Sequence, residues 1–288
     1  MSLRVAPIMP ADVPTVADFL HAHLNRRLSS RVWARSLTVP WKVDAPNHGF
    51  MLVDEKAGNR VVGAYLAFYA DRMIDGERVA FCNLGGWCVL PEHRLHSVRL
   101  LSALLAQEGY HFTDLTPSGN VVPINQRYDF QPLDTTLAAV PNLPWPSLPG
   151  RIRVSSDPRV VERTLRGPDL ELYHDHAGTQ AARHVVLTHR GETCYVVFRR
   201  DRPKNLPLFA SLVHVSNPAL FRRGFRPFTR HLLIRHRLPA TLVELRVAGY
   251  RPWPAVNLGT PRHKMFRSRR LRPDQIDYLY SELVCVPF

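Results

Sequence analysis

Residues Trp87–Leu105 read WCVLPEHRLHSVRLLSALL, and this stretch decides the fold more than any other. A β-rich run ends at Pro91, polar and basic residues follow, and an apolar helical pattern begins near Ser97. A helix N-terminus presents unsatisfied N–H groups and partial positive charge, which suits a phosphate. Arg94 and Arg99 would add fixed positive charge beside those amides. The stretch therefore predicts a strand, an anion-binding loop and a helix.

The surrounding elements extend this into a mixed sheet with helices. Between 79 and 90 a strand carries Gly85-Gly86, and paired glycines indicate a bulge or a close backbone approach. The hydrophobic spacing predicts helices over 12–27, 97–107 and 121–127, and strands over 49–54, 61–70 and 110–115.

The central motif resembles that of the GNAT acyltransferase superfamily. That family has V-x-P-x-x-R/Q-x-x-G-x-G/A between a strand and a helix, and this chain has Val89-Leu-Pro91-Glu-His-Arg94-Leu-His-Ser97-Val-Arg99. The opening segment 4–12 looks like the family's first strand and helix start. Phe130 lies where the family's last Gly-Phe pair is found. The resemblance covers about residues 3–137.

The resemblance implies an acyl donor bound along the central strand, either acetyl-CoA or another acyl-CoA, with acyl-carrier protein as a further possible donor and no metal. The backbone around Trp87–Leu90 would pair with the pantetheine arm and polarise the thioester carbonyl. An amine or hydroxyl acceptor would then attack directly. The donor-binding residues expected in this way are Cys88, Val89, Leu90, Arg94, Leu95, His96, Ser97, Val98 and Arg99.

Two features depart from the family pattern. Ser97 and Arg99 occupy the positions of small residues, which let the backbone approach phosphate closely. Asn125 stands five residues before Phe130, where the family usually has an acidic tyrosine. Candidate catalytic residues are therefore Asn83, on the central strand, with Ser118 and Asn125, which follow the next strand.

The densest proline stretch, Val140–Gly150, predicts a division of the chain. It separates a donor-binding domain, 1–139, from a basic domain, 151–288, with 140–150 as the linker. In the second half a hairpin, a strand, an arginine-bearing loop over 216–224, a helix and a strand repeat the earlier order. The fold class expected is α/β with α+β character: two tandem GNAT-like domains, each a mixed, mostly antiparallel sheet flanked by helices.

Charge is concentrated in the second half. The chain carries a formal net charge of +14, and 16 of its 38 Lys and Arg residues lie in 202–273 beside one acid, Glu244. This asymmetry indicates a polyanionic partner, such as an acidic carrier protein or tRNA. An arginine-rich proteome would produce the same excess without any such partner. The basic residues that could contact a polyanion form two groups, one of Arg222, Arg223, Arg226 and Arg230, the other over 262–272.

Composition sets the remaining bounds. Hydrophobic residues make up 45% and charged residues 22%, as in globular proteins. The four cysteines form no C-x-x-C pair, which argues against a disulfide framework or a zinc ribbon. No apolar run approaches the ~20 residues of a transmembrane helix, and no secretory signal is evident. We expect a reduced, cytoplasmic protein, and the composition does not indicate its oligomeric state.

The sequence therefore predicts an acyltransferase, and two alternatives stay open. One is an aminoacyl-tRNA-dependent transferase, which the basic second half favours and the CoA-type motif disfavours. The other is a catalytically inactive GNAT-like module that binds carrier protein or nucleic acid.

Overall fold

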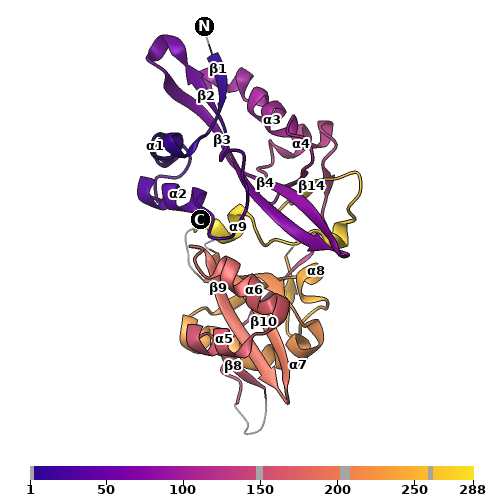
Figure 1. Cartoon of the computed structure of the whole chain (residues 1–288). Coiled ribbons are helices and arrows are strands. Elements are labelled where there is room, and N and C mark those ends of the chain that lie inside the picture. Colours follow the sequence, from indigo (N-terminus) through magenta and orange to yellow (C-terminus); the bar gives the residue numbers. More distant parts are fainter. Residues whose placement is uncertain (1–2, 147–151, 202–207, 259–261) are drawn as a thin grey trace. The chain divides into compact units, whose positions relative to one another are not determined.

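The computed structural model describes residues 3–146, 152–201, 208–258 and 262–288. It forms two compact units. Within the described residues, each unit contains a seven-stranded mixed sheet flanked by helices (Figure 1). Unit 1 comprises Met1–Leu133, His263–Ile276 and Tyr280–Val286, and unit 2 comprises Asp134–Arg262, Asp277–Leu279 and Pro287–Phe288.

The sheet of unit 1 has the strand order β1-β2-β3-β4-β5-β14-β6. Figure 1 shows α1 and α2 on one side of this sheet and α3 and α4 on the other. The strands are β1 (Leu3–Pro7), β2 (Gly49–Asp54), β3 (Arg60–Ile74), β4 (Glu77–Val89), β5 (His111–Asp114), β6 (Gln131–Pro132) and β14 (Met265–Arg267). The α-helices are α1 (Val13–His23), α2 (Ser30–Leu37), α3 (Val98–Leu105), α4 (Val122–Arg127) and α9 (Glu282–Cys285).

The long strand β3 forms the centre of this unit. Its residues from Val61 to Ala70 are all buried, although side chains on a strand alternate between the two faces. An uninterrupted apolar run of this kind requires cover on both faces of the sheet. The helices on either side provide that cover, which explains why the run lacks the polar alternation of a half-exposed strand.

The elements predicted in the first half are present, with shifted ends. The strand expected over 61–70 extends to Arg60–Ile74, and the helix expected over 12–27 ends at His23. Helix α2 was not predicted. Its start is fixed by Ser29, whose hydroxyl accepts a hydrogen bond from the Val32 amide at 3.4 Å.

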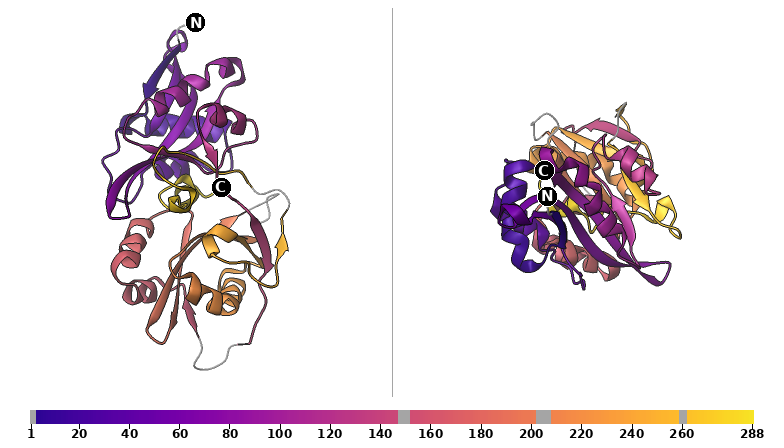
Figure 2. Two further views of the ribbon diagram at one scale, coloured as in Figure 1. Left: turned by 90° about the vertical axis from the view of Figure 1, so that its right-hand side faces the viewer. Right: turned by 90° about the horizontal axis from the view of Figure 1, so that it is seen from above.

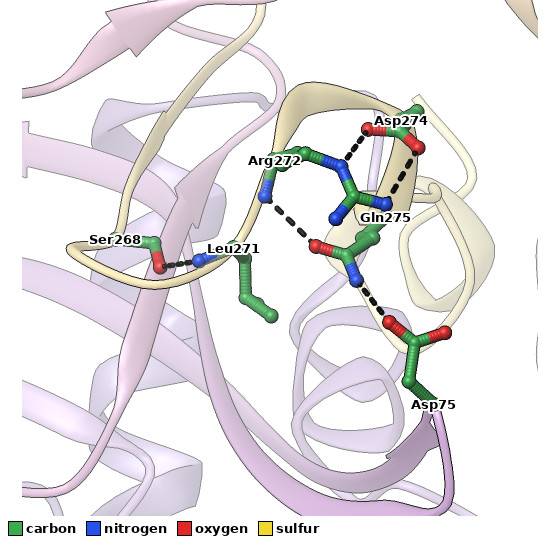
Figure 3. A network of polar contacts seen from close by, with 6 residues as sticks. All are labelled: Asp75, Ser268, Leu271, Arg272, Asp274 and Gln275. Carbon is green, nitrogen blue, oxygen red and sulfur yellow. Dashed lines mark hydrogen bonds and ion pairs between the residues drawn. The ribbon is translucent and has the colours of Figure 1, made fainter.

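The C-terminal segment returns to unit 1, where β14 pairs antiparallel with β5 and β6. In Figure 2 this yellow segment lies against the violet strands of unit 1. Figure 3 shows how it is held at the β3–β4 turn: Gln275 Nε2 donates to Asp75 Oδ2 at 2.6 Å, and Gln275 Oε1 accepts from the Arg272 amide at 2.9 Å. Arg272 also contacts Asp274. The segment is thus an integral part of the first unit.

The sheet of unit 2 has the order β13-β7-β12-β11-β10-β9-β8. Its strands are β7 (Leu137–Pro141), β8 (Arg153–Ser155), β9 (Ala182–His189), β10 (Glu192–Asp201), β11 (Phe209–Val215), β12 (Ala240–Glu244) and β13 (Val256–Asn257). Its α-helices are α5 (Pro158–Thr164), α6 (Gly167–His176), α7 (Pro218–His236) and α8 (Leu245–Ala248).

Both sheets contain the same crossover. Among the described strands, β4 and β5 are the parallel pair of the first sheet, and β11 and β12 are that of the second. A parallel pair needs a long connection, which α3 supplies in unit 1 and α7 in unit 2. This arrangement agrees with the repeated succession of elements in the sequence.

The arginine-bearing loop expected over 216–224 is absent, because this stretch is helical. Helix α7 begins at Pro218, a residue tolerated in the first turn of a helix. The Asn217 side chain caps it by accepting the Leu220 amide at 2.9 Å. Arg222 and Arg223 therefore lie on a helix and not on a phosphate-binding loop.

The boundaries of the two units also differ from those of the predicted domains. Val140 and Pro141 end β7, which pairs with β12, so the sheet of unit 2 begins before the proline-rich stretch. Asn142 continues this packing, since its side chain donates to the Leu238 carbonyl at 2.7 Å. Residues 147–150 of the expected linker lie outside the described residues. Residues 263–276, expected in the second domain, pack in unit 1.

Candidate functional site

Strands β4 and β5 separate halfway along β4. Their pairing runs from Phe81 with His111 to Leu84 with Asp114, where β5 ends. Strand β4 continues to Val89 and remains paired only with β3 on its other side. The edge of β4 beyond Leu84 therefore carries backbone groups that β5 does not use, and an extended ligand could pair with them.

A bulge marks the point of separation. Along the β3–β4 pair, Leu66 lies opposite Gly85 and Ala64 opposite Cys88, so Tyr65 faces two residues, Gly86 and Trp87. Gly86 has φ +62°, a left-handed conformation that favours glycine. The bulge expected from the paired glycines is thus confirmed.

A pocket of about 760 Å³ opens at this edge. Its walls come from the end of β4, the turn that leads into α3, the segment before α4 and the end of α1. The lining residues are Ala22, His23, Leu24, Arg26, Trp87, Cys88, Val89, Leu90, Pro91, Arg94, Ser97, Ser118, Asn120, Val121 and Ile124.

The lining has a positive charge. Arg26 and Arg94 both contribute to it, and no carboxylate is found among the described residues that line the pocket. Arg26 is oriented by a bond from its Nε to the Ala22 carbonyl, at 3.1 Å. Guanidinium groups present several N–H donors in a planar fork that matches phosphate oxygens. The pocket is therefore suited to an anionic ligand.

The aromatic wall of the pocket has a fixed geometry. Trp87 stacks on Tyr65, with ring centroids 4.5 Å apart and planes 8° from parallel. Its indole N–H is buried and has no hydrogen-bond partner among the described residues.

The pocket brings together six of the residues expected from the sequence: Cys88, Val89, Leu90, Arg94, Ser97 and Ser118. The other expected donor-binding residues, Leu95, His96, Val98 and Arg99, do not line it. Leu95 is 96% exposed. Arg99 Nη2 donates to the Leu3 carbonyl at 3.1 Å, so this side chain turns to β1 and its bulk does not fill the pocket.

Some of the expected loop amides are already in use. The Ser97 amide donates to the Arg94 carbonyl at 3.0 Å, because Pro91–His96 form a 3₁₀ helix rather than an open loop. Any contribution of this turn to phosphate binding therefore depends more on the Arg94 side chain than the sequence suggested.

Asn83 and Asn125 lie in the interior and not on the pocket. Asn83 is 2% exposed, donates to Thr113 Oγ1 at 3.0 Å and accepts the Glu282 amide at 2.9 Å. Asn125 is fully buried and donates to Asp114 Oδ2 at 2.8 Å. These hydrogen bonds connect strands and helices of unit 1. The Asn125 Oδ1 atom is buried and has no hydrogen-bond partner among the described residues.

The thiol at the pocket is poorly suited to be a nucleophile. Burial raises the pKa of Cys88, although the charge of Arg94 lowers it in part. A thiol with a raised pKa stays protonated, and only the thiolate attacks readily. Cys88 forms part of the pocket wall, and its raised pKa does not favour a role as nucleophile.

The C-terminal end of α1 supplies pocket residues that sequence reasoning missed. His23, Leu24 and Arg26 belong to this group. Packing of this part of the chain against the bulge of β4 determines their position. Leu24 lies close to the bulge, since a Cβ added at Gly86 would be 3.7 Å from Leu24 Cδ2. The apolar spacing of the helix signals its buried face, but nothing in its sequence shows that its end lies over the bulge of β4.

Several solved structures that resemble this chain in fold are named as acetyltransferases or acyltransferases. A GCN5-related N-acetyltransferase from Anabaena variabilis matches with a TM-score of 0.60 at 12% identity, over 92% of this chain and 72% of that one. A probable N-acyltransferase from Enterococcus faecalis matches with a TM-score of 0.59 at 13% identity, over 93% and 73%. An N-myristoyltransferase from Saccharomyces cerevisiae with bound myristoyl-CoA matches with a TM-score of 0.53 at 12% identity, over 99% and 89%.

The chain accordingly shares the fold of these solved structures, and the matches extend over most of its length. No protein-family model matches the sequence. No curated protein matches it either. In the part of the chain that the structure describes, no helix is long and apolar enough to cross a membrane.

Proposed function

We propose that unit 1 binds an acyl-CoA at the free edge of β4 and transfers its acyl group to an amine or hydroxyl acceptor. One observation carries this proposal: β4 loses its partner β5 after Leu84, at a glycine bulge, and a pocket opens there whose described lining residues include two arginines and no carboxylate. The fold shared with acyltransferases, one of them with bound myristoyl-CoA, supports the same donor class.

The residues present fit such a donor. The backbone edge of Trp87–Val89, which β5 leaves unpaired, can pair with the amides of a pantetheine arm. Arg94 and Arg26 supply positive charge for the pyrophosphate. Arg99, which seemed too large for its motif position, is directed to Leu3 and leaves the pocket open.

The chemistry requires polarisation of a thioester carbonyl and the movement of two protons. Backbone N–H groups at the bulge can stabilise the charge that develops on the carbonyl oxygen. His23 contributes an imidazole to the lining, and an imidazole nitrogen can accept the proton of the attacking amine. Ser118, at the opposite wall, can donate to the leaving thiolate.

The test compares two arginines of the same motif. Arg94→Ala should weaken binding of acetyl-CoA or a long-chain acyl-CoA about tenfold or more in isothermal titration, because it removes a charge from the lining. Arg99→Ala is the matched control, since Arg99 does not line the pocket.

Equal losses in the two variants would contradict the placement of the donor. The absence of binding by any acyl-CoA to the unaltered chain would overturn the proposal itself.

A further inference from the structure

A second pocket, of about 570 Å³, lies in unit 2 and is lined in part by residues of α7. The proposed function does not use it. Its lining residues are Ile152, His189, Arg222, Arg223, Phe225, Arg226, Pro227, Tyr250, Arg251 and Trp253.

Four of these residues are arginines, and no carboxylate is found among the described residues of the lining. Arg223 forms an ion pair with Glu192. Arg251 is held by the Asn257 side chain and the Ala255 carbonyl, both at 3.2 Å. These two neutral oxygens orient the Arg251 guanidinium without cancelling its charge.

The remaining two arginines lie over aromatic rings. Arg222 lies 5.7 Å from the centre of the Tyr250 ring, and Arg226 lies 4.7 Å from that of Trp145. Burial raises the pKa of Tyr250 well above its ordinary value, so its ring is neutral. The rings hold both guanidinium groups in place while leaving their positive charge available to an anion.

Trp253 adds a flat apolar surface to the same pocket. Its side chain is 72% exposed, which is unusual for the largest apolar residue type. Aromatic side chains beside basic grooves provide stacking surfaces for nucleobases, and every base has such a face. A phosphate alone would need the arginines but would gain nothing from the tryptophan.

From these observations we propose that the pocket of α7 binds a nucleoside phosphate, with the phosphate on Arg222, Arg226 and Arg251 and the base on Trp253. Its concave form suits one nucleotide unit better than the flat face of an acidic protein. The unit can come from a free nucleotide or from a strand of single-stranded RNA, since both have the same chemistry. The proposal does not rest on acyl transfer in unit 1.

The test uses the full chain and two probes: a fluorescein-labelled uridine octanucleotide followed by anisotropy, and AMP followed by isothermal titration. Arg222→Ala and Trp253→Leu should each lower the affinity for the probe that binds by about tenfold. Arg235→Ala is the matched control, because Arg235 is exposed on the last turn of the same helix and does not line the pocket. The affinity of the Arg235→Ala variant for the probe should stay within about twofold of that of the unaltered chain.

The two probes distinguish the sources. Binding of the octanucleotide without AMP identifies an RNA strand, and the slope of log K against log salt should then decrease by about 0.7 for each arginine removed. Binding of AMP with the same variant pattern identifies a free nucleotide.

Three results would overturn the proposal. They are binding of neither probe at millimolar concentration, equal losses in the Arg222 and Arg235 variants, or full binding by Trp253→Leu. Circular dichroism melting of each variant separates a lost site from a lost fold.

Discussion

Asp114 is a carboxylate in the interior of unit 1, 3% exposed at the end of β5. Asn125 donates to its Oδ2 at 2.8 Å, and the Tyr65 hydroxyl does so at 3.4 Å. Burial raises the pKa of Asp114 to about 6, and the bonds from Asn125, Thr116 and Tyr65 offset part of that rise. The Asn125 side chain thus provides a hydrogen-bond donor to the buried Asp114 carboxylate, which explains why Asn125 is itself buried.

The raised pKa has a consequence for stability. The folded chain binds the Asp114 proton more tightly than the unfolded chain, whose carboxyl has a pKa of about 4. The contribution of this group to the free energy of unfolding therefore falls, by up to about 3 kcal/mol, as pH rises from about 4 to about 6. Urea unfolding of the unaltered chain and Asp114→Asn should show a difference that changes over this interval and is constant above it. A difference independent of pH would contradict the assignment.

Helix and strand types were predictable in the first half because their patterns are local. The run Val61–Ala70 and the proline at the end of β4 each have a single good structural interpretation, and the paired glycines indicated a bulge or a close backbone approach. In the second half, a loop was expected over 216–224, where the first half of α7 forms instead. An Asn cap and the apolar residues Phe221, Phe225 and Phe228 stabilise this helix, since buried apolar faces provide most helix stability.

At the scale of one strand, the bulge of β4 can be tested by two glycines. A Cβ at Gly86 would lie 3.0 Å from Leu66 Cδ1, and the residue has φ +62°. Gly86→Ala should reduce the free energy of unfolding by about 1–2 kcal/mol and weaken acyl-CoA binding, because the edge of β4 must shift.

Gly76→Ala is the control for this change. Gly76 also has a positive φ, +82°, but a Cβ there would meet nothing within 4 Å. Chemical denaturation should show a comparable backbone penalty, while titration should show unchanged acyl-CoA binding. Loss of binding in both variants would mean that the bulge has no special role.

For the whole molecule, the return of the C-terminal segment determines how unit 1 is built. Strand β14 completes the sheet beside β5, and the amide of Glu282 donates to Asn83 at 2.9 Å. The two chain segments meet where the Leu133 amide donates to the Lys264 carbonyl at 2.9 Å. Unit 1 is therefore discontinuous in sequence.

A chain of residues 1–139 should consequently fail to unfold cooperatively, because it lacks β14 and α9 and exposes the edge of β5. Residues 1–133 joined to 263–286 by about six Gly and Ser residues should recover a cooperative transition in circular dichroism. Such a short connection suffices because the ends are adjacent. A cooperative, fully stable 1–139 would show that the returning segment is dispensable.

The sequence by itself determined the fold class, the glycine bulge and much of one pocket wall, Cys88–Leu90 with Arg94 and Ser97. These follow from a contiguous motif, whose strand, turn and helix are set by neighbouring residues. Only the tertiary structure showed that His23 and Arg26 line that pocket and that Asn83, Asn125 and Arg99 do not. It also showed that residues 263–276 belong to unit 1. These outcomes depend on contacts between residues far apart in the chain, where burial and hydrogen-bond partners are set by packing that no local pattern records.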